Sequence, residues 1–248
     1  MKTKILIIGD SCQDIYTYCD VKRLSPEKPV PILEVDHVEK MPGMAMNVYR
    51  NVCNMLPNKS KVDIVTNDNW ESVTKNRFVD EKSNHMFCRV DTPKFTESID
   101  VFDLKLGDYE HVIVSDYDKG FLFWDDIEWI CANHDSVFLD TKKTLDTWAY
   151  DAKYIKINNF EAEKSAGFVG IFGDKVIQTL GRDGVMWDGQ MYPVKHEVET
   201  LDVSGAGDTF LAALVVSYSQ DNDIVRAIKY ANKQASKVVS KRGTSVPN

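Results

Sequence analysis

The chain has 248 residues, of which 43% are hydrophobic and 27% are charged, and its formal net charge is −8. This length and composition predict a single globular domain that spans residues 1–248. The acidic balance, with no basic patch in the sequence, argues against a nucleic-acid partner.

The cysteines and the N-terminus indicate the compartment. The five cysteines are scattered and lack Cys-x-x-Cys spacing, which argues against a disulfide framework or a zinc site and favours a reducing, cytoplasmic compartment. The apolar run Ile5–Ile8 is too short for a signal peptide or a membrane span. We therefore expect no membrane association.

The first half of the chain predicts a buried strand followed by a lid. The run Ile5–Ile8 ends at Gly9-Asp10, which predicts a parallel strand that delivers Asp10 to the edge where open α/β sheets bind ligands. Residues 16–40 are strand-like but are interrupted by a proline-rich segment, so they predict edge strands or a lid outside the main sheet. Helical spacing follows over residues 44–56, and residues 77–91 predict a hairpin.

From residue 111 onward, strands alternate with helices. We expect strands at 111–115, 136–140, 154–157 and 175–179, and helices at 123–133 and 223–239. This alternation predicts a mostly parallel sheet covered on both faces. Polar residues follow the strands at Asp10, Asp116, Asp140, Asn158 and Thr179, so they should gather at one edge of the sheet.

The segment Glu199–Phe210 carries the most chemistry. Gly205 and Gly207 permit positive φ and close approach of a ligand, and the apolar run from about Gly207 predicts a buried helix. The first amides of such a helix favour a phosphate. Asp208 lies in the same turn, where the dipole should favour its ionised form, and it could accept a proton from an attacking hydroxyl. This turn predicts phosphoryl transfer; the alternative is a plain helix capped by Ser204 or Asp202.

A series of short motifs is spread along the chain between residue 5 and residue 246, in the order in which one protein family has them. They are Gly9–Asp14, Arg23–Pro31, Pro42–Asn47, Ser115–Gly120, Asn158–Glu161, Thr179–Gly184, Ala231-Asn232 and Lys241–Thr244. Together they resemble the ribokinase-like, or PfkB, family of carbohydrate kinases, most closely the kinase domain of the heptose-phosphate kinases. The resemblance implies a three-layer α/β/α sandwich with a mostly parallel central sheet and a small β-strand lid, inserted at about 16–40 and 77–91.

The resemblance also implies roles on the acceptor side. Asp208 would be the general base, and the N–H groups of Gly205, Ala206 and Gly207 would form the anion hole. The residues implied to bind the sugar are Asp10, Asp14, Gly43 and Asn47. For an anionic acceptor, we expect contacts from some of Arg77, Arg89 and Lys119.

On the donor side, the resemblance implies ATP and Mg²⁺ as cofactors. Asn158 and Glu161 would organise magnesium–ATP, with Glu161 toward the metal. The implied nucleotide pocket consists of Thr179, Gly181, Gly184, Asn232 and Gly243. The lid strands would also pair with a second subunit, giving a homodimer.

Several of these residues also have ordinary structural explanations. Asp10 could cap the next segment, Asn47 and Asn232 could be plain helix residues, Glu161 a first-turn acid and Lys119 a solvated turn residue. The sequence alone leaves these alternatives open.

The chain departs from the family strings at several positions. Met44 replaces the second glycine of a Gly-Gly pair, and we expect it to narrow the pocket or stiffen the lid hinge. Asp118 stands where the heptose-kinase string has alanine, and Asp140-Thr-Lys-Lys143 replaces Asp-Pro-Lys-Gly. A strand–helix stretch is missing between Thr66 and Ser72, so the sheet should be trimmed at one edge. No nucleotidyltransferase domain follows Asn248, so we expect the second activity of some heptose kinases to be absent.

The leading hypothesis is an ATP-dependent kinase of a sugar or sugar phosphate, with a heptose 7-phosphate as the favoured acceptor. A ribokinase-like or nucleoside-type acceptor is the first alternative. A catalytically weak sugar-phosphate sensor is the second; Met44 favours it, and the retention of Asp208 with both glycines argues against it. A nicotinamide dehydrogenase lacks support, because no Gly-x-x-Gly follows Gly9-Asp10.

Overall fold

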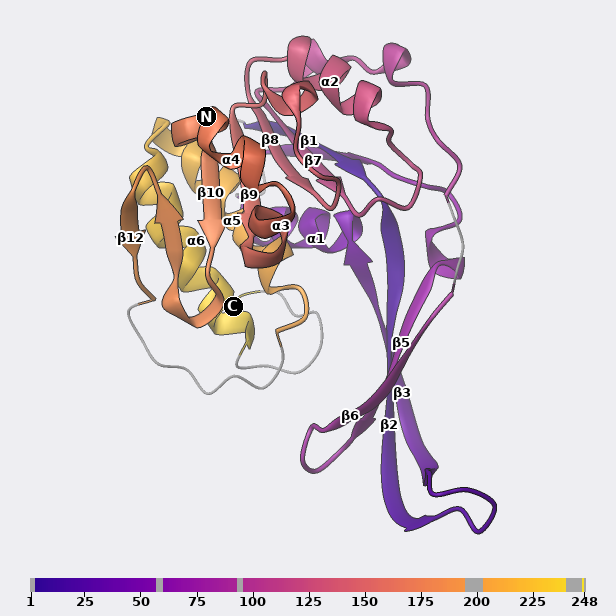
Figure 1. Cartoon of the computed structure of the whole chain (residues 1–248). Coiled ribbons are helices and arrows are strands. Elements are labelled where there is room, and N and C mark those ends of the chain that lie inside the picture. Colours follow the sequence, from indigo (N-terminus) through magenta and orange to yellow (C-terminus); the bar gives the residue numbers. More distant parts are fainter. Residues whose placement is uncertain (1–2, 57–59, 93–95, 195–202, 240–246, 248) are drawn as a thin grey trace.

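The computed structural model describes residues 3–56, 60–92, 96–194, 203–239 and 247. They form a large sheet with covering helices and a separate four-stranded lid that extends away from it (Figure 1). Within these residues, no helix is both long enough and apolar enough to cross a membrane.

The large sheet has eight strands in the order β12-β11-β10-β9-β8-β7-β1-β4. Pairing is parallel from β4 through β10, and β11 and β12 add an antiparallel edge, so the predicted mostly parallel sheet is confirmed. The strands are β1 Lys4–Gly9, β4 Lys61–Val65, β7 His111–Asp116, β8 Val137–Thr141, β9 Tyr154–Asn158, β10 Val176–Thr179, β11 Val185–Trp187 and β12 Gln190–Tyr192. The sequence analysis missed β4 and the hairpin β11–β12, which are short.

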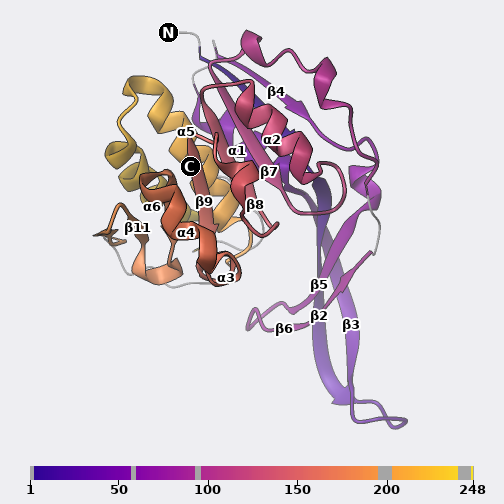
Figure 2. The same cartoon turned by 45° about the horizontal axis from the view of Figure 1, so that its top comes forward.

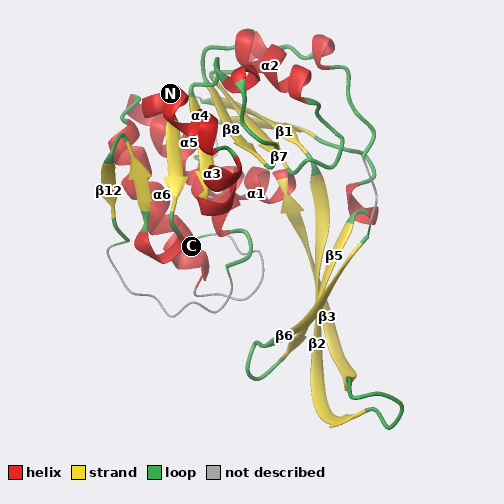
Figure 3. Cartoon of the chain, viewed as in Figure 1, coloured by secondary structure: helices red, strands yellow, loops and turns green. Residues whose placement is uncertain are grey.

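Helices cover both faces of this sheet, as Figure 3 shows in red. One face packs against α1 Ala45–Met55, α5 Ala206–Asp221 and α6 Ile224–Val239. The other packs against α2 Trp124–Ala132 and α4 Ala166–Phe172, while the short α3 Asn159–Lys164 follows β9. Strand alternation explains the two cores, since Ile5 and Ile7 of β1 face the first layer and Leu6 and Ile8 the second. Short 3₁₀ helices lie at Trp70–Ser72, Val101–Asp103, Leu106–Asp108, Thr147–Ala149, Gly173–Lys175 and Gly181–Asp183.

Helix α5 runs through the core, as its composition predicts. Every residue from Asp208 to Tyr218 is buried. Gly205 precedes the helix with φ 75°, a conformation that glycine adopts without steric cost, and no side chain caps this end. The N-cap is therefore Gly205 and not Ser204, while Asp202 lies outside the described residues.

The lid is a second sheet in the order β3-β2-β5-β6. Its strands are β2 Ser11–Leu24, β3 Pro31–Met44, β5 Thr74–Asp80 and β6 Met86–Asp91. Figures 1 and 2 both show these strands leaving the helical body together as one arm. The predicted lid segments are thus strands, and the proline-rich segment is the turn between β2 and β3.

Met44 lies where the lid joins α1. Its backbone has φ 61° and ψ −134°, a region that strongly favours glycine. Its side chain is nevertheless buried and packs with Cys12, Val73 and Tyr117. Burial of the side chain thus offsets an unfavourable backbone conformation.

We predict that Met44→Gly is more stable than Met44→Ala. Both variants lose the buried side chain, but only glycine relieves the positive φ, which costs on the order of 1 kcal/mol or more for other residues. Urea unfolding of the two variants measures the difference.

The matched control is Val48 of α1, which is also fully buried. At this helical position glycine should be less stable than alanine, by about 1 kcal/mol. The same ranking at both positions would contradict strain at Met44.

Candidate active site

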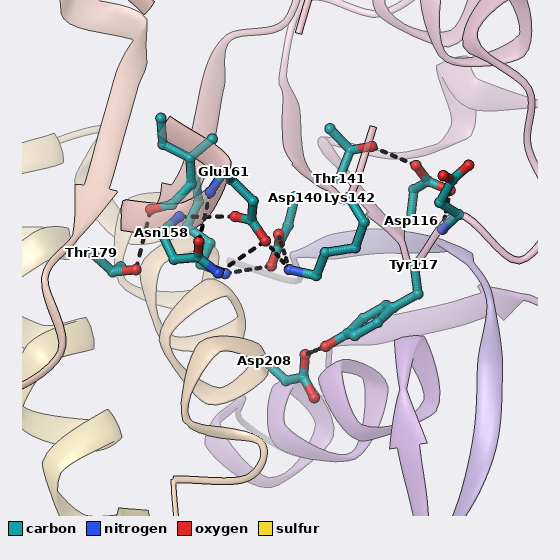
Figure 4. Close-up of polar contacts among 12 residues, drawn as sticks. Asp116, Tyr117, Asp140, Thr141, Lys142, Asn158, Glu161, Thr179 and Asp208 are labelled. Carbon is teal, nitrogen blue, oxygen red and sulfur yellow. Dashed lines mark hydrogen bonds and ion pairs between the residues drawn. The ribbon is translucent and has the colours of Figure 1, made fainter. Parts of the chain in front are cut away.

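The predicted catalytic residues and most of the predicted donor-side residues line one cleft at the carboxyl edge of the large sheet. Among the described residues, this cleft has a volume of about 1380 Å³. The predicted residues that line it are Asn158, Thr179, Gly181, Gly184, Gly205, Ala206, Gly207, Asp208 and Asn232. Figure 4 shows its inner end, where side chains from β8, β9, α3 and α5 converge.

Asp208 is buried in the first turn of α5 and is held on both oxygens. Asn47 Nδ2 donates to Oδ2 at 2.9 Å, and the Tyr117 hydroxyl donates to Oδ1 at 2.5 Å (Figure 4). Asn47 is itself fully buried, so the alternative in which it faces solvent is wrong.

Burial raises the pKa of Asp208 above its usual value, although the hydrogen bonds from Asn47 and Tyr117 lower it. The expected effect of the helix dipole on Asp208 stays a prediction, because burial is the largest cause of the shift. A raised pKa suits a proton acceptor, since the carboxylate then binds a proton more readily.

A buried lysine lies against the start of α5. A Cβ on Gly207 would come within 3.1 Å of Lys156 Nζ, so the ammonium sits beside the proposed anion hole. The Lys156 side chain is only 5% exposed and forms an ion pair with Asp140 at 2.7 Å. The sequence analysis missed Lys156, yet a lysine inside the apolar run 154–157 was a usable signal, because a buried charge needs a partner.

Asn158 and Glu161 form a reciprocal capping box at the start of α3. The Asn158 N–H donates to Glu161 Oε2 at 2.8 Å, and the Glu161 N–H donates to Asn158 Oδ1 at 2.9 Å. The Glu161 carboxylate also contacts the Lys142 ammonium. Glu161 is thus a first-turn helix acid that also belongs to the inner charged cluster.

The carboxylates around Lys142 fit a magnesium ion. Among the described residues, Asp140 Oδ1 is buried without a hydrogen-bond donor and faces only the Lys142 ammonium, 3.6 Å away. Glu161 contacts the same ammonium. Magnesium is usually held by one or two carboxylates together with waters and substrate phosphates, which is the donor set that Asp140 and Glu161 offer.

Three of the predicted acceptor-side residues, Asp14, Gly43 and Arg77, lie together at the base of the lid. Arg77 Nη1 donates to Asp14 Oδ1 at 2.5 Å, so the charge of Arg77 is matched by Asp14. Gly43 packs directly on Asp14, where a Cβ would overlap the Oδ2 atom. Any side chain at this position would therefore have to displace the Asp14 carboxylate from its present place.

Lys75 is a further cation near the site that was not predicted from the sequence. It pairs in register with Asp14 on the lid, and its Nζ lies 4.8 Å from the centre of the Tyr117 ring. Within the described part of the chain, no carboxylate forms an ion pair with this ammonium. It is therefore better suited to receive an anion than the paired Arg77.

The remaining predicted residues lie farther from the reacting groups. Asp10 is fully buried and accepts from the N–H groups of Tyr117 at 2.7 Å and Phe121 at 3.4 Å, so it holds the loop after β7. Burial and the neighbouring Asp116 raise the pKa of Asp10 to about 6. A sugar contact from Asp10 stays a prediction.

Four predicted residues remain, of which the structure describes three. Arg89 is paired with Asp91 at 2.8 Å on the lid, and Lys119 lies on the loop after β7. Asn232 is buried and donates to the Tyr192 carbonyl at 2.9 Å. Gly243 lies outside the described residues. Roles for these positions stay predictions.

Comparison with known proteins identifies the family. The family model described as pfkB family carbohydrate kinase matches residues 104–248. The bifunctional protein HldE of a Nitratiruptor species is 28% identical over 294 residues, covering 99% of this chain and 63% of that protein. HldE of Helicobacter acinonychis (strain Sheeba) is 29% identical over 302 residues, covering 98% and 64%. The chain thus spans a little under two thirds of the length of these curated relatives.

Solved structures share the fold. The ribokinase of Thermotoga maritima has a TM-score of 0.74 at 16% identity, covering 98% of this chain and 94% of that one. The Arabidopsis thaliana ribokinase complexed with ribose and ATP has a TM-score of 0.69 at 13% identity, covering 98% and 94%. The predicted ribokinase-like fold is confirmed.

Proposed function

This chain belongs to the pfkB family of carbohydrate kinases, and we propose that it transfers the γ-phosphoryl group of ATP to a hydroxyl of a phosphorylated sugar. The observation that carries the proposal is the start of α5. There a buried carboxylate, fixed by two hydrogen bonds, lies beside a helix N-terminus and a buried lysine.

Asp208 would act as the general base. An acceptor hydroxyl that donates to Asp208 loses its proton to the carboxylate while its oxygen attacks the γ-phosphorus, and ADP departs. The N–H groups of Gly205, Ala206 and Gly207 would stabilise the negative charge on the transferring group. Lys156, beside Gly207, would add a fixed positive charge at the same place.

Asn158, Glu161 and Asp140 would organise the donor. When bound, Mg²⁺ neutralises charge on the ATP phosphates, and Glu161 with Asp140 would hold it. Lys142 lies between these two carboxylates and lines the cleft, so its ammonium can turn toward a phosphate. ATP as donor is supported by the Arabidopsis ribokinase, which was solved with ribose and ATP.

The proposed acceptor class is a sugar phosphate, with a heptose 7-phosphate as the favoured member. The Arg23–Pro31 string, similar to that of the heptose kinases, supports the heptose. Lys75 supports the phosphate, because its ammonium has no carboxylate partner among the described residues and lies against Tyr117, the tyrosine that contacts the base.

A coupled assay of ADP release over a panel of sugars, nucleosides and sugar phosphates tests the function. We expect turnover with a sugar phosphate. Turnover only with ribose-like sugars or nucleosides would favour the alternative acceptors. Tight calorimetric binding without ADP formation would favour a sensor, and neither binding nor turnover would overturn the proposal.

We predict that Asp208→Asn keeps ATP affinity but loses at least about 10²-fold in kcat, the usual cost of removing a general base. Steady-state kinetics and ATP calorimetry measure the two effects. Asp221→Asn, at the exposed end of the same helix, is the matched control and should retain activity. Normal turnover by Asp208→Asn would mean that another group takes the proton.

We predict that Lys75→Met raises the KM for a phosphorylated acceptor about ten- to hundredfold and leaves the KM for ATP unchanged. One hydrogen bond to a charged group contributes about 1.5–3 kcal/mol, and about 1.4 kcal/mol corresponds to tenfold in binding. Lys22→Met removes the same charge from an exposed lid lysine that pairs with Glu34 and serves as the control. Equal effects of both variants would exclude a specific role for Lys75.

The lid should also pair with a second copy of the chain. Val38 and Val90 are exposed on the lid, and strand alternation puts both on the face opposite Lys75 and Arg77. Sedimentation velocity should show a dimer that Val38→Lys with Val90→Lys converts to monomer. A monomeric unmodified chain at micromolar concentration would contradict this pairing.

A further inference from the structure

Three departures from the family strings meet in one cluster. Thr141 Oγ1 donates to Asp116 Oδ2 at 2.5 Å, and Lys143 Nζ lies 2.9 Å from both Asp116 oxygens. Lys143 also forms an ion pair with Asp118 at 3.0 Å. The family strings have proline, glycine and alanine at the positions of Thr141, Lys143 and Asp118, and none of these side chains could form such contacts.

Two members of the cluster, Asp116 and Lys143, are largely buried, while Asp118 is exposed. The Asp116 side chain is fully buried and that of Lys143 is 14% exposed. Burial alone would lower the pKa of Lys143, but Asp116 and Asp118 raise it above its usual value, so the ammonium stays charged. Loss of Lys143 would leave the buried Asp116 carboxylate with hydrogen bonds from Thr141 and the Asp118 N–H but without a counter-charge, which is unfavourable. The cluster therefore ties the loop after β7 to the loop after β8.

Tyr117 lies in the middle of this tied loop. Its N–H donates to Asp10, its ring packs against Cys12, Met44 and Val73, and its hydroxyl reaches Asp208 (Figure 4). Burial and the charge of Asp208 raise the pKa of Tyr117 well above its usual value. The hydroxyl therefore stays protonated and is the donor in the bond to Asp208.

We propose that Tyr117 is a positioning residue for the base Asp208, and that the Asp116–Lys143 cluster holds Tyr117 in place. With Asn47 on the other oxygen, Tyr117 fixes the plane of the carboxylate and leaves its remaining lone pairs for the acceptor hydroxyl. This inference rests on the proposed function, in which Asp208 is the base.

A role in positioning predicts a change in pH dependence. The bond from Tyr117 favours the charged form of Asp208, so its loss should raise the pKa of Asp208 further. The rate depends on ionised Asp208, so the acidic limb of kcat should move to higher pH. The other charged or titratable groups around Asp208 are Cys12, Asp140, Lys142 and Lys156, and these stay in place in the variants below.

Tyr117→Phe is the first test, because it keeps the ring and removes only the hydroxyl. We expect kcat to fall about tenfold, as for the loss of one hydrogen bond to a charged group, with the acidic limb moved to higher pH and the KM for ATP unchanged. Tyr109→Phe is the matched control, because it removes a 2.6 Å tyrosine–aspartate bond, to Asp63, away from the cleft. Equal kcat and pH profiles for the two variants would overturn the role of Tyr117.

Lys143→Met tests the second half of the proposal. It should lower kcat in the same direction as Tyr117→Phe, and in a chain that already carries Tyr117→Phe it should have little further effect on kcat. Lys143→Arg keeps the charge and should restore most of kcat. Fully additive effects, or no recovery with arginine, would mean that the cluster does not act through Tyr117.

A measurement without turnover separates this inference from the proposed function. The difference in unfolding free energy between the unmodified chain and Asp208→Asn, followed against pH, reports the ionisation of Asp208 in the fold. The same difference is then measured between Tyr117→Phe and the chain that carries both Tyr117→Phe and Asp208→Asn. This second curve should lie at higher pH than the first, even if no acceptor is phosphorylated. If the two curves coincide, the hydrogen bond from Tyr117 does not affect the pKa of Asp208, whatever the result of the substrate panel.

Discussion

The constraint on which the site depends is the burial of the Asp208 carboxylate at the start of α5. A buried carboxylate is costly unless donors surround it, and its two donors come from elements far apart in the chain. Asn47 belongs to α1, at the base of the lid, and Tyr117 belongs to the loop after β7. Correct placement of the Asp208 carboxylate therefore depends on α1, the loop after β7 and α5 together.

The second feature of the site is that its lysines alternate with acidic residues, although the chain as a whole is acidic. Lys156 pairs with Asp140, Lys142 lies between Asp140 and Glu161, and Lys143 pairs with Asp116. Burial raises the pKa of Asp140, but Lys156 and Lys142 lower it below its usual value, so this carboxylate stays ionised. Each of these lysines is thus paired with an acid. In the proposed function, Lys142 and Lys156 would let a chain with a net charge of −8 receive a polyanionic donor.

The sequence predicted the layers, the parallel sheet, the lid and the gathering of strand-end residues, because each rests on local periodicity or on where parallel strands end. It did not predict Tyr117, Lys142, Lys156 or Lys75 as site residues. Their partners are distant in the chain, and only Lys156, inside an apolar run, left a local signal in the sequence. The raised pKa of Asp208 was not predicted either, because the depth of burial that causes it cannot be read from the sequence.

Three departures from the family strings, Met44, Thr141 and Lys143, differ in kind but lie around the same tyrosine, Tyr117. Met44 adopts a backbone conformation suited to glycine and packs its side chain on Tyr117. Thr141 and Lys143 instead bind the carboxylate of the preceding residue, Asp116. Glycine at positions 44 and 143 would leave both sides of Tyr117 freer, since glycine adds backbone freedom and no side-chain contact. The three substitutions therefore all restrict the movement of Tyr117, whose hydroxyl contacts Asp208. A stiff support favours a base held ready before the acceptor arrives, at the cost of backbone strain at Met44.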